Sequence, residues 1–540
     1  MANPSLQIGN SNWAIKEDNL LGYSTAGTRF VPQPITMTRA SAGTRVNSSG
    51  LVETVELLGS ELVTNGDFEN NVIGWNKFKS NATESWNAGG YLDFTKTGVS
   101  GRLGSDVLIE TNKTYKISVN VISLGGILDL YVGLSDFESP YAGVSSTPLV
   151  VGTNTFYLTF AGSASSKGVY LQSAGSNYFG LTASIDSISV KESTKNNLAR
   201  VDYDGTASSL LAEPQRRNLV TYSEVISNLT LLIGGAGTYT ITDNYTNSPE
   251  GVQNASRVQM SIVDTNDGAN YSLIALNSSM TNGVTREISF YAKSLTGLNQ
   301  EVLVYWSTAK QIVTLTNDWQ RFEISGTSNN SGAVLIGTRG GTTQYYAGGD
   351  ANLDFAIWGL QVEDDGSGGG SSYATSYIPT SGSTVTRVQD QYSKTGISNL
   401  INSEEGVLFV EMAALSDDST NRQLTLSDGS DTNRIVLKYD NQSNIIQSFN
   451  RVSGVETASL SATVSDITQF SKIAIKYKLN DYAMWIDGVE VDTDNSGTTF
   501  PSSTLNKLSF GTSSSLFAKV KQLQVYDTSL SDTQLAALTS

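Results

Sequence analysis

The sequence predicts an all-β protein made of several β-sandwich modules, and three observations support this. Residues 113–119 alternate polar and apolar side chains with a period of two, as a half-buried strand does. Two distant stretches share one skeleton, since Thr114, Ile117 and Ser118 recur as Thr285, Ile288 and Ser289. The 50 glycines, together with abundant Ser, Thr and Asn, indicate short strands joined by tight turns.

The two related stretches extend outward into matching openings and closings. Residues 62–64 and 219–221 open the two copies, and residues 188–192 and 360–364 close them. Each copy is therefore about 130–150 residues long, which is the size of a whole domain and too long for a solenoid repeat. We predict jelly-roll modules at residues 61–193 and 215–365.

The remaining residues fall into four further segments. Residues 1–60 show little alternation and are predicted to form an extended arm or edge strand that packs on something larger. Residues 194–214 and 366–395 are expected to be connectors. By composition, residues 364–372 are typical of a flexible linker, and the alternative is that residues 373–380, which follow directly, return to pack on the preceding module. Residues 396–540 are predicted to form a sandwich with a hairpin turn at Asp487 and Gly488 and a final helix capped by Ser531.

Composition excludes several classes of function. The chain has 540 residues, with 34 Lys and Arg against 51 Asp and Glu, for a formal charge of −17. Such an acidic chain would be repelled by nucleic acid and by anionic lipid, so we expect neither as a partner. It has no cysteine and no histidine, which excludes disulfides, thiol nucleophiles, Ser-His-Asp triads and His-ligated metals.

The ends and the hydropathy of the chain lead to three more expectations. No apolar run is long enough to cross a membrane, so we expect no membrane insertion. The N-terminus lacks the basic and apolar regions of a secretory signal peptide. Paired carboxylates could still support glycoside hydrolysis, but the sequence does not indicate which acidic residues would pair. We therefore expect a protein that is not an enzyme.

The C-terminal part resembles the concanavalin A-like, laminin-G-like lectin fold. The resemblance rests on the strand-hairpin at residues 484–491 (MWIDGVEV) and on the strand and short helix at residues 525–535. It covers about a quarter of the chain. It implies a sandwich of two antiparallel sheets.

The two copies resemble jelly-roll, galactose-binding-like carbohydrate-binding modules. Residues 65–69 (NGDFE), followed by Trp75, and residues 185–190 are similar to the first and last strands of that family. The second copy departs from the pattern at residues 222–225 (YSEV). In the family these strands often hold a structural calcium, so the resemblance implies Asp67, Glu69 and Asp186 as oxygen ligands in the first copy.

The connectors resemble a set that recurs in bacteriophage virion proteins, namely appendage, fibre and minor structural proteins. The set comprises residues 38–51, 199–203, 211–224, 357–363 and 374–382. The resemblance implies a protein that is made in the host cytoplasm and is located on the phage particle. It does not decide between head and tail. It also implies partners among other virion proteins, which we expect the arm of residues 1–60 to contact.

Aromatic residues are the candidate sugar-binding groups, because the C–H face of a pyranose packs on aromatic rings. We single out Trp86, Tyr91 and Trp306 as carbohydrate-binding candidates. Trp75 is expected in the core of its sandwich, whereas Trp86 lies among Ser, Asn and Gly and its exposure is open.

These observations lead to one main hypothesis and two alternatives. The main hypothesis is a phage-particle protein that displays glycan-binding modules for attachment to host surface glycans. We expect it to act as a homo-oligomer, and a trimer is common among fibres. The first alternative is purely architectural decoration of the capsid or tail without sugar binding. The second is a depolymerase of host polysaccharide.

Overall fold

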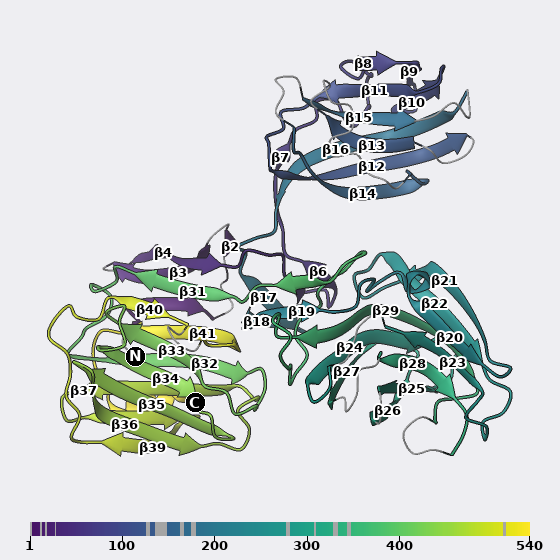
Figure 1. Ribbon diagram of the computed structural model, residues 1–540. Helices are drawn as coiled ribbons and strands as arrows, with labels where there is room; N and C mark the ends of the chain where they lie inside the picture. Colours follow the sequence, from purple (N-terminus) through teal and green to yellow (C-terminus); the bar gives the residue numbers. More distant parts are fainter. Residues whose placement is uncertain are drawn as a thin grey trace. The chain divides into compact units, whose positions relative to one another are not determined.

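The computed structural model describes residues 3–10, 13, 15–16, 19–26, 29–125, 130–135, 148–162, 167–173, 180–276, 281–306, 309–327, 333–342, 347–510 and 515–540 (Figure 1). The chain forms two compact units, Glu56–Lys195 and the pair Met1–Val55 with Asn196–Ser540. Almost all of the regular structure is β, which confirms the predicted fold class.

The unit Glu56–Lys195 is the first copy of the repeat, folded as a β-sandwich. Its strands are β7 (Leu57–Glu61), β8 (Lys77–Ser80), β9 (Ala82–Asn87), β10 (Tyr91–Lys96), β11 (Gly101–Asp106), β12 (Thr114–Gly125), β13 (Leu130–Ser135), β14 (Gly152–Thr159), β15 (Gly168–Ser173) and β16 (Thr182–Thr194). One sheet has the order β14-β12-β16-β10-β9, with β7 also paired to β16, and the other has the order β11-β15-β13. Because β7 belongs to this sheet, the module begins about five residues before the predicted boundary at residue 61.

The second copy forms another two-sheet sandwich. Its elements are β19 (Arg216–Asn218), the 3₁₀ helix η1 (Ile226–Asn228), β20 (Thr230–Gly234), β21 (Thr238–Asn247), β22 (Gln253–Ser261), β23 (Tyr271–Ala275), β24 (Thr285–Ser294), β25 (Gln300–Trp306), β26 (Ala309–Leu315), β27 (Gln320–Thr327), β28 (Leu335–Arg339), β29 (Asn352–Asp364) and β30 (Val385–Arg387). One sheet contains β21, β22, β29, β24, β27, β19 and β30, and the other has the order β20-β23-β28-β25-β26.

The repeated skeleton occupies equivalent positions in the two sandwiches. The first stretch forms β12, between β14 and β16, and the second forms β24, between β27 and β29. The hydroxyls of Thr114 and Thr159 lie 2.9 Å apart across strands, and those of Thr285 and Thr327 lie 2.6 Å apart in the same place. The sequence repeat is therefore a structural repeat.

The C-terminal sandwich takes in both ends of the chain. Its elements are β1 (Leu6–Gly9), β2 (Ile15–Lys16), β3 (Asn19–Ala26), β4 (Arg29–Thr38), β17 (Arg200–Asp204), β18 (Ala207–Ala212), β31 (Gln391–Thr395), β32 (Glu405–Ala414), β33 (Arg422–Ser427), β34 (Arg434–Tyr439), β35 (Ile445–Val452), β36 (Val455–Thr463), β37 (Ser471–Lys478), β38 (Tyr482–Ile486), β39 (Val489–Asp494), β40 (Lys507–Ser509), β41 (Ala518–Tyr526) and α1 (Asp532–Thr539). A separate two-stranded hairpin joins β5 (Thr44–Val46) to β6 (Val52–Thr54).

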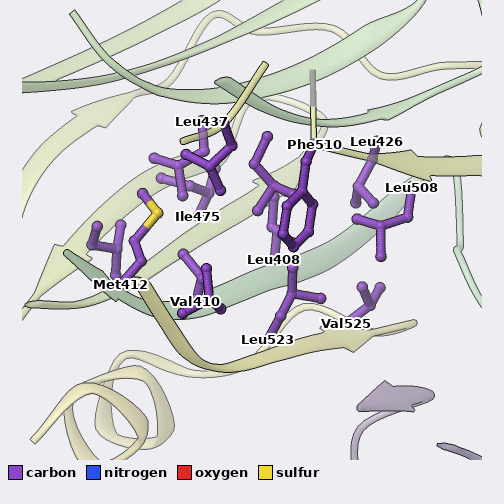
Figure 2. Close-up of a cluster of buried hydrophobic side chains, with 14 of the residues drawn as sticks. Leu408, Val410, Met412, Leu426, Leu437, Ile475, Leu508, Phe510, Leu523 and Val525 are labelled. Atoms are coloured by element: carbon purple, nitrogen blue, oxygen red, sulfur yellow. The ribbon is translucent and has the colours of Figure 1, made fainter. Parts of the chain in front are cut away.

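The core of this sandwich lies between two layers of strands. Figure 2 shows Leu408, Val410 and Leu523 of β32 and β41 facing Leu426 and Leu508 of β33 and β40. All five side chains are almost fully buried. Alternation with period two therefore places one face of each strand in the core, as the sequence predicts.

Two local predictions for the C-terminal sandwich are confirmed. Asp487 and Gly488 both have positive φ, at 48° and 87°, so they form the hairpin turn between β38 and β39. In front of α1, the backbone N–H of Ser531 donates to Oε1 of Gln534 at 3.0 Å, which forms a capping box. Leu535 is fully buried against β37 and β38.

The arm predicted at residues 1–60 is not a free extended anchor. β1 pairs with β41, β3 pairs with β1 and β4, and β4 pairs with β31. The backbone N–H and C=O groups of this segment, for which we expected a virion partner, therefore form hydrogen bonds with other strands of the same chain. Sequence alternation gave no sign of the pairing with β41 and β31, because these strands lie several hundred residues away.

The two predicted connectors also fold onto the rest of the chain. Residues 200–212 form the hairpin β17–β18, which pairs with β41. Residues 371–382 return to the second module, where the backbone N–H of Ser371 donates to the carbonyl of Thr285 at 3.0 Å. The alternative of a segment that folds back is therefore right, and the flexible linker is wrong.

Buried ion pairs hold these connectors together. Asp390 accepts a hydrogen bond from Nη1 of Arg39 at 2.6 Å and forms a second ion pair with Arg200. Glu213 forms ion pairs with Arg200 at 2.6 Å and with Arg387 at 2.7 Å. We call these five residues the arginine–carboxylate cluster. All of them are at least 90% buried. Each comes from a different connector or strand end, so the cluster joins the N-terminal strands, the β17–β18 hairpin and the segment before β31.

The cluster keeps its carboxyl groups ionised. Burial would raise the pKa of Glu213, but Arg387 and Arg200 outweigh it and hold the pKa well below its usual value. Burial opposes ionisation of Asp390 in the same way, and Arg200 and Arg39 lower its pKa. Both acids are therefore charged partners of the arginines over the ordinary pH range.

Candidate functional site

The outer face of the larger sheet in the first module is the candidate site. β10 shows why, because Leu92 and Phe94 are buried in the core while Tyr91 and Asp93 point away from it and are half-buried. β16, which pairs with β10, and β12, which pairs with β16, alternate in the same way. This face therefore consists of polar side chains and tyrosines that are open to solvent, and we call it the open face.

Hydrogen bonds fix the orientation of the carboxylates on the open face. Oδ2 of Asp93 accepts a hydrogen bond from Nδ2 of Asn87 at 3.1 Å, and its Oδ1 accepts one from the Ser184 hydroxyl at 2.7 Å. Oδ2 of Asp186 accepts Nδ2 of Asn120 at 2.9 Å. Each carboxylate keeps free lone pairs, so both can accept hydrogen bonds from ligand hydroxyl groups without reorganisation.

Tyr91 lies in the same row of the sheet as Asp186. Leu92 pairs with Ile185, so the residues on either side of that pair, Tyr91 and Asp186, are neighbours across β10 and β16. Asn87 pairs directly with Tyr91 on the other side. An aromatic ring flanked by two fixed polar groups offers a stacking surface and hydrogen bonds to one sugar ring.

The other end of the open face is already occupied by the module's own side chains. The Tyr157 hydroxyl donates to Glu56 at 3.1 Å, and Nζ of Lys195 lies 3.1 Å from the centre of its ring. Nζ of Lys116 donates to Glu56 at 2.6 Å. Burial would raise the pKa of Glu56, but Lys116 outweighs it and lowers the pKa. The ring of Tyr157 is therefore engaged, and Tyr91 is the aromatic residue left for a ligand.

The three sugar-binding candidates from the sequence have different positions. Tyr91 lies on the open face. Trp86 pairs with Leu92, so it belongs to the core side of the sheet edge, where it is 42% exposed and its Nε1 donates to the carbonyl of Phe68 at 2.9 Å. Trp306 is only 3% exposed and lies in the core of the second module. Trp306 therefore offers no ring face to a sugar.

The burial of Trp306 has a local cause. A Cβ atom at Gly326 would lie 1.6 Å from Cζ2 of Trp306, so the glycine leaves the space that the indole fills. The sequence-based prediction did not consider this residue of β27.

The three residues proposed to hold calcium lie on two elements of the first module. Asp67 and Glu69 are exposed in the loop after β7, while Asp186 is engaged with Asn120 on β16. Across the described ranges, no group of three or more acidic, His or Cys residues is arranged to hold a metal ion. The assignment of Asp67, Glu69 and Asp186 to calcium therefore stays a prediction from the resemblance.

The equivalent face of the second module is covered by the chain itself. Tyr377, in the segment that folds back, packs against Trp358 of β29 in a tilted arrangement with ring centres 4.5 Å apart, and both are buried together with Val52 of β6. Thr375 donates to Glu363 through its backbone N–H at 2.9 Å and through its hydroxyl at 2.7 Å. Among the described residues, such a covering segment lies on the second copy and not on the first.

Two half-buried carboxylates, Glu224 and Glu250, lie near the covering segment. Nδ2 of Asn254 donates to Glu250 at 3.0 Å and to Glu224 at 3.3 Å, and the Tyr377 hydroxyl donates to Glu224 at 2.8 Å. Burial raises the pKa of Glu250 to about 7, and the neighbouring Glu224 adds to the rise. Glu250 therefore carries a proton in the folded protein at mildly acidic pH.

This arrangement predicts a pH-dependent effect of Glu250→Gln. Because the folded-state pKa is raised from 4.5 to about 7, the stabilisation from proton binding is complete below pH 4.5 and is lost as the pH rises through 7. Glu250→Gln should therefore raise the thermal midpoint of unfolding at pH 8 and change it little at pH 5. Glu301→Gln, at an exposed position of β25, serves as the control. An equal shift at both pH values would contradict the prediction.

Sequence reasoning missed Asn87, Asp93 and Asn120, the polar partners on the open face. Alternation along β10 could have placed Asp93 on the side of Tyr91. The pairing of Asn120 with Asp186 depends on the register of β12 and β16, which contains a bulge.

Comparison with known proteins gives structural similarity only. No protein-family model matches the sequence, and no curated protein matches it. The carbohydrate-binding module CBM40 of the Ruminococcus gnavus IT-sialidase, bound to α2,3-sialyllactose, matches with 19% identity over 25% of this chain and 83% of that chain, at a TM-score of 0.22. The CBM22-1–CBM22-2 tandem domain of Paenibacillus barcinonensis Xyn10C matches with 12% identity over 56% of this chain and 98% of that chain, at a TM-score of 0.20.

Domains LG4-5 of the mouse laminin alpha1 chain match with 10% identity over 49% of this chain and 91% of that chain, at a TM-score of 0.19. These TM-scores are too low to assign a function, and the fold rests on the strand pairings described above. The search for membrane spans, limited to the described residues, finds no helix with the length and apolar character needed to cross a bilayer.

Proposed function

We propose that the chain is a non-catalytic glycan-binding protein of a bacteriophage particle, and that the first module supplies the binding site. The observation that carries the binding part is the open face, where Tyr91 lies beside Asp93 and Asp186 in fixed orientations. Its two carboxylates favour neutral sugars or amino sugars and repel acidic ones.

The second module has a bracing role in this proposal. Its equivalent face is filled by Tyr377 and Val52, so it holds the connectors and offers no sugar surface there. The two functions left open by the sequence, display and architecture, are thus divided between the two copies.

The location on a phage particle rests on the resemblance of residues 38–51 and 374–382 to virion connectors. A particle would present the protein in several copies at its surface. Weak sugar contacts on many copies gain effective affinity by avidity, which suits a shallow site on a sheet face. Binding of purified particles by an antibody raised against the chain would test the location.

The absence of catalysis is part of the same proposal. A pocket of about 440 Å³ between the connectors is lined by carboxylates, and three of them, Asp202, Glu213 and Glu323, already have cationic partners. Asp202 pairs with Lys519 at 3.1 Å and Glu323 with Arg321 at 2.7 Å. Neither is poised as the free acid or base that glycoside hydrolysis needs. Release of reducing ends from host polysaccharide by the purified chain would contradict this.

The binding proposal predicts the effect of Tyr91→Ala. Loss of the ring should weaken binding of neutral glycans by at least about tenfold, equivalent to about 1.4 kcal/mol, on a glycan array and by calorimetry. Tyr245→Ala is the matched control, because Tyr245 is a half-exposed tyrosine of the second module with Arg257 over its ring.

The result is decisive in either direction. Unchanged affinity in Tyr91→Ala, or an equal loss in Tyr245→Ala, would contradict the assignment of the site to the open face. A chelator should leave binding unchanged, because Asp93 and Asp186 bind the ligand through hydrogen bonds in this proposal.

A further inference from the structure

A second pocket lies on the C-terminal sandwich and is built from both ends of the chain. Its strands are β4 from the N-terminal region and β31, β40 and β33 from the C-terminal region, paired in that order. The pocket has a volume of about 730 Å³, within the range of about 300–1,000 Å³ that is usual for small-molecule sites.

The sheet presents hydroxyl groups on the side of this pocket. Thr36 pairs with Ser393, Ser393 with Ser509, and Ser509 with Thr425, so one row of four hydroxyl-bearing residues crosses the four strands. The Thr425 and Ser509 hydroxyls lie 2.8 Å apart. Figure 2 shows that Leu508, next to Ser509, points into the core, so Ser509 points to the other side.

Neutral polar and aromatic groups complete the lining. Gln391 lies beside Thr38, whose hydroxyl donates to its Oε1 at 3.3 Å, which leaves the Nε2 group of Gln391 available to a ligand. Phe517, which is half-buried, supplies aromatic surface. Hydroxyl, carboxamide and aromatic groups together match the alternating hydroxyl and C–H surfaces of a sugar.

The charge of this pocket differs from that of the rest of the chain. None of the described residues that line it carries a carboxylate, although the chain has a formal charge of −17. Lys507 lies two residues before Ser509 on the same face of β40, is half-buried, and forms no ion pair with a carboxylate in the described ranges. A partly desolvated ammonium group without a counter-charge attracts an anion from the ligand.

We infer that this pocket binds an acidic oligosaccharide, with the carboxylate of a hexuronic acid-type residue paired to Lys507 and the sugar hydroxyls on the row of Thr36, Ser393 and Ser509. The site is separate from the open face of the first module and has the opposite charge preference. The chain would therefore engage neutral glycans through one unit and acidic glycans through the other.

The inference can be tested with the intact chain and a tetrasaccharide of hexuronic acid, compared by calorimetry with its carboxyl-reduced form. The native chain should bind the acidic form at least about tenfold more tightly than the reduced form. Lys507→Gln should lower the affinity for the acidic form to that for the reduced form. Gln391→Ala should weaken both.

Two controls keep the outcome specific. Lys394→Gln alters another half-buried lysine on the neighbouring strand, where Lys394 pairs with Leu508 and does not line the pocket. Lys394→Gln and Tyr91→Ala should both leave binding of the acidic form unchanged. The inference is overturned if the native chain shows no preference for the acidic form, or if Lys394→Gln loses as much affinity as Lys507→Gln. It is also overturned if Tyr91→Ala abolishes binding, because the ligand would then lie on the first module.

Discussion

Asp390→Asn should lower the free energy of unfolding of the larger unit by about 3–5 kcal/mol, because it removes one charge from a buried ionic cluster. Asp390 accepts hydrogen bonds from Arg39, Arg200 and the backbone N–H of Glu213, the last at 2.9 Å. The asparagine keeps the shape but leaves three buried guanidinium groups with one carboxylate. Their mutual repulsion and lost solvation are then no longer offset.

The loss should be seen as a lower denaturant midpoint and as faster hydrogen exchange in residues 371–395. Residues 56–195 should keep their protection, since they form a separate compact unit. Glu53→Gln is the control, because the pair of Arg45 and Glu53 is partly exposed, at 23% and 37%, and its loss should cost less than about 1 kcal/mol. Equal stability losses in the two variants would show that the cluster does not hold the connectors.

The arginine–carboxylate cluster also shows what sequence reasoning could and could not supply. Residues 384–387 (TVTR) echo residues 36–39 (TMTR), which indicated equivalent connectors. The structure places the arginines of both motifs, Arg387 and Arg39, in one cluster. Their carboxylate partners were not predictable, because Glu213 and Asp390 meet them only through the folding of distant segments.

Period-two alternation predicts which residues share a face of a strand, but not which face is covered. Applied to β10, it would place Leu92 and Phe94 opposite Tyr91 and Asp93, as the structure does. It could not show that Tyr377 would cover the outer face of the second module, or that the same face of the first module would stay open. The repeat predicted two similar sandwiches, and the difference between them lies in segments outside the repeat.

The same limit explains the treatment of the N-terminal residues. A segment with little alternation was expected to need an external partner, and β4 instead pairs with β31 in the C-terminal sandwich. Strand pairing depends on backbone groups that every residue carries, so composition does not reveal it. The pocket lined by Thr36 and Lys507 was invisible in the sequence for this reason.

Trp75→Ala should have the largest effect on the first module. Trp75 is fully buried, its Nε1 donates to the carbonyl of Asn65 at 3.0 Å, and its ring packs edge-on against Phe68 at 5.2 Å. Removal of a buried tryptophan costs about 3–5 kcal/mol through lost burial and the cavity left behind. That is a large part of the roughly 5–15 kcal/mol that holds a domain folded.

Because residues 56–195 form their own unit, Trp75→Ala should abolish hydrogen-exchange protection and glycan binding in the first module only. Trp86→Ala provides the contrast: its side chain is 42% exposed, so the variant should lose only about 0.5–1.5 kcal/mol, the net contribution of its hydrogen bond to Phe68. Tyr91→Ala should lose binding while protection is kept, which separates a damaged fold from a damaged site. If Trp75→Ala kept both its protection and its affinity, the core of the first module would not be where the structure places it.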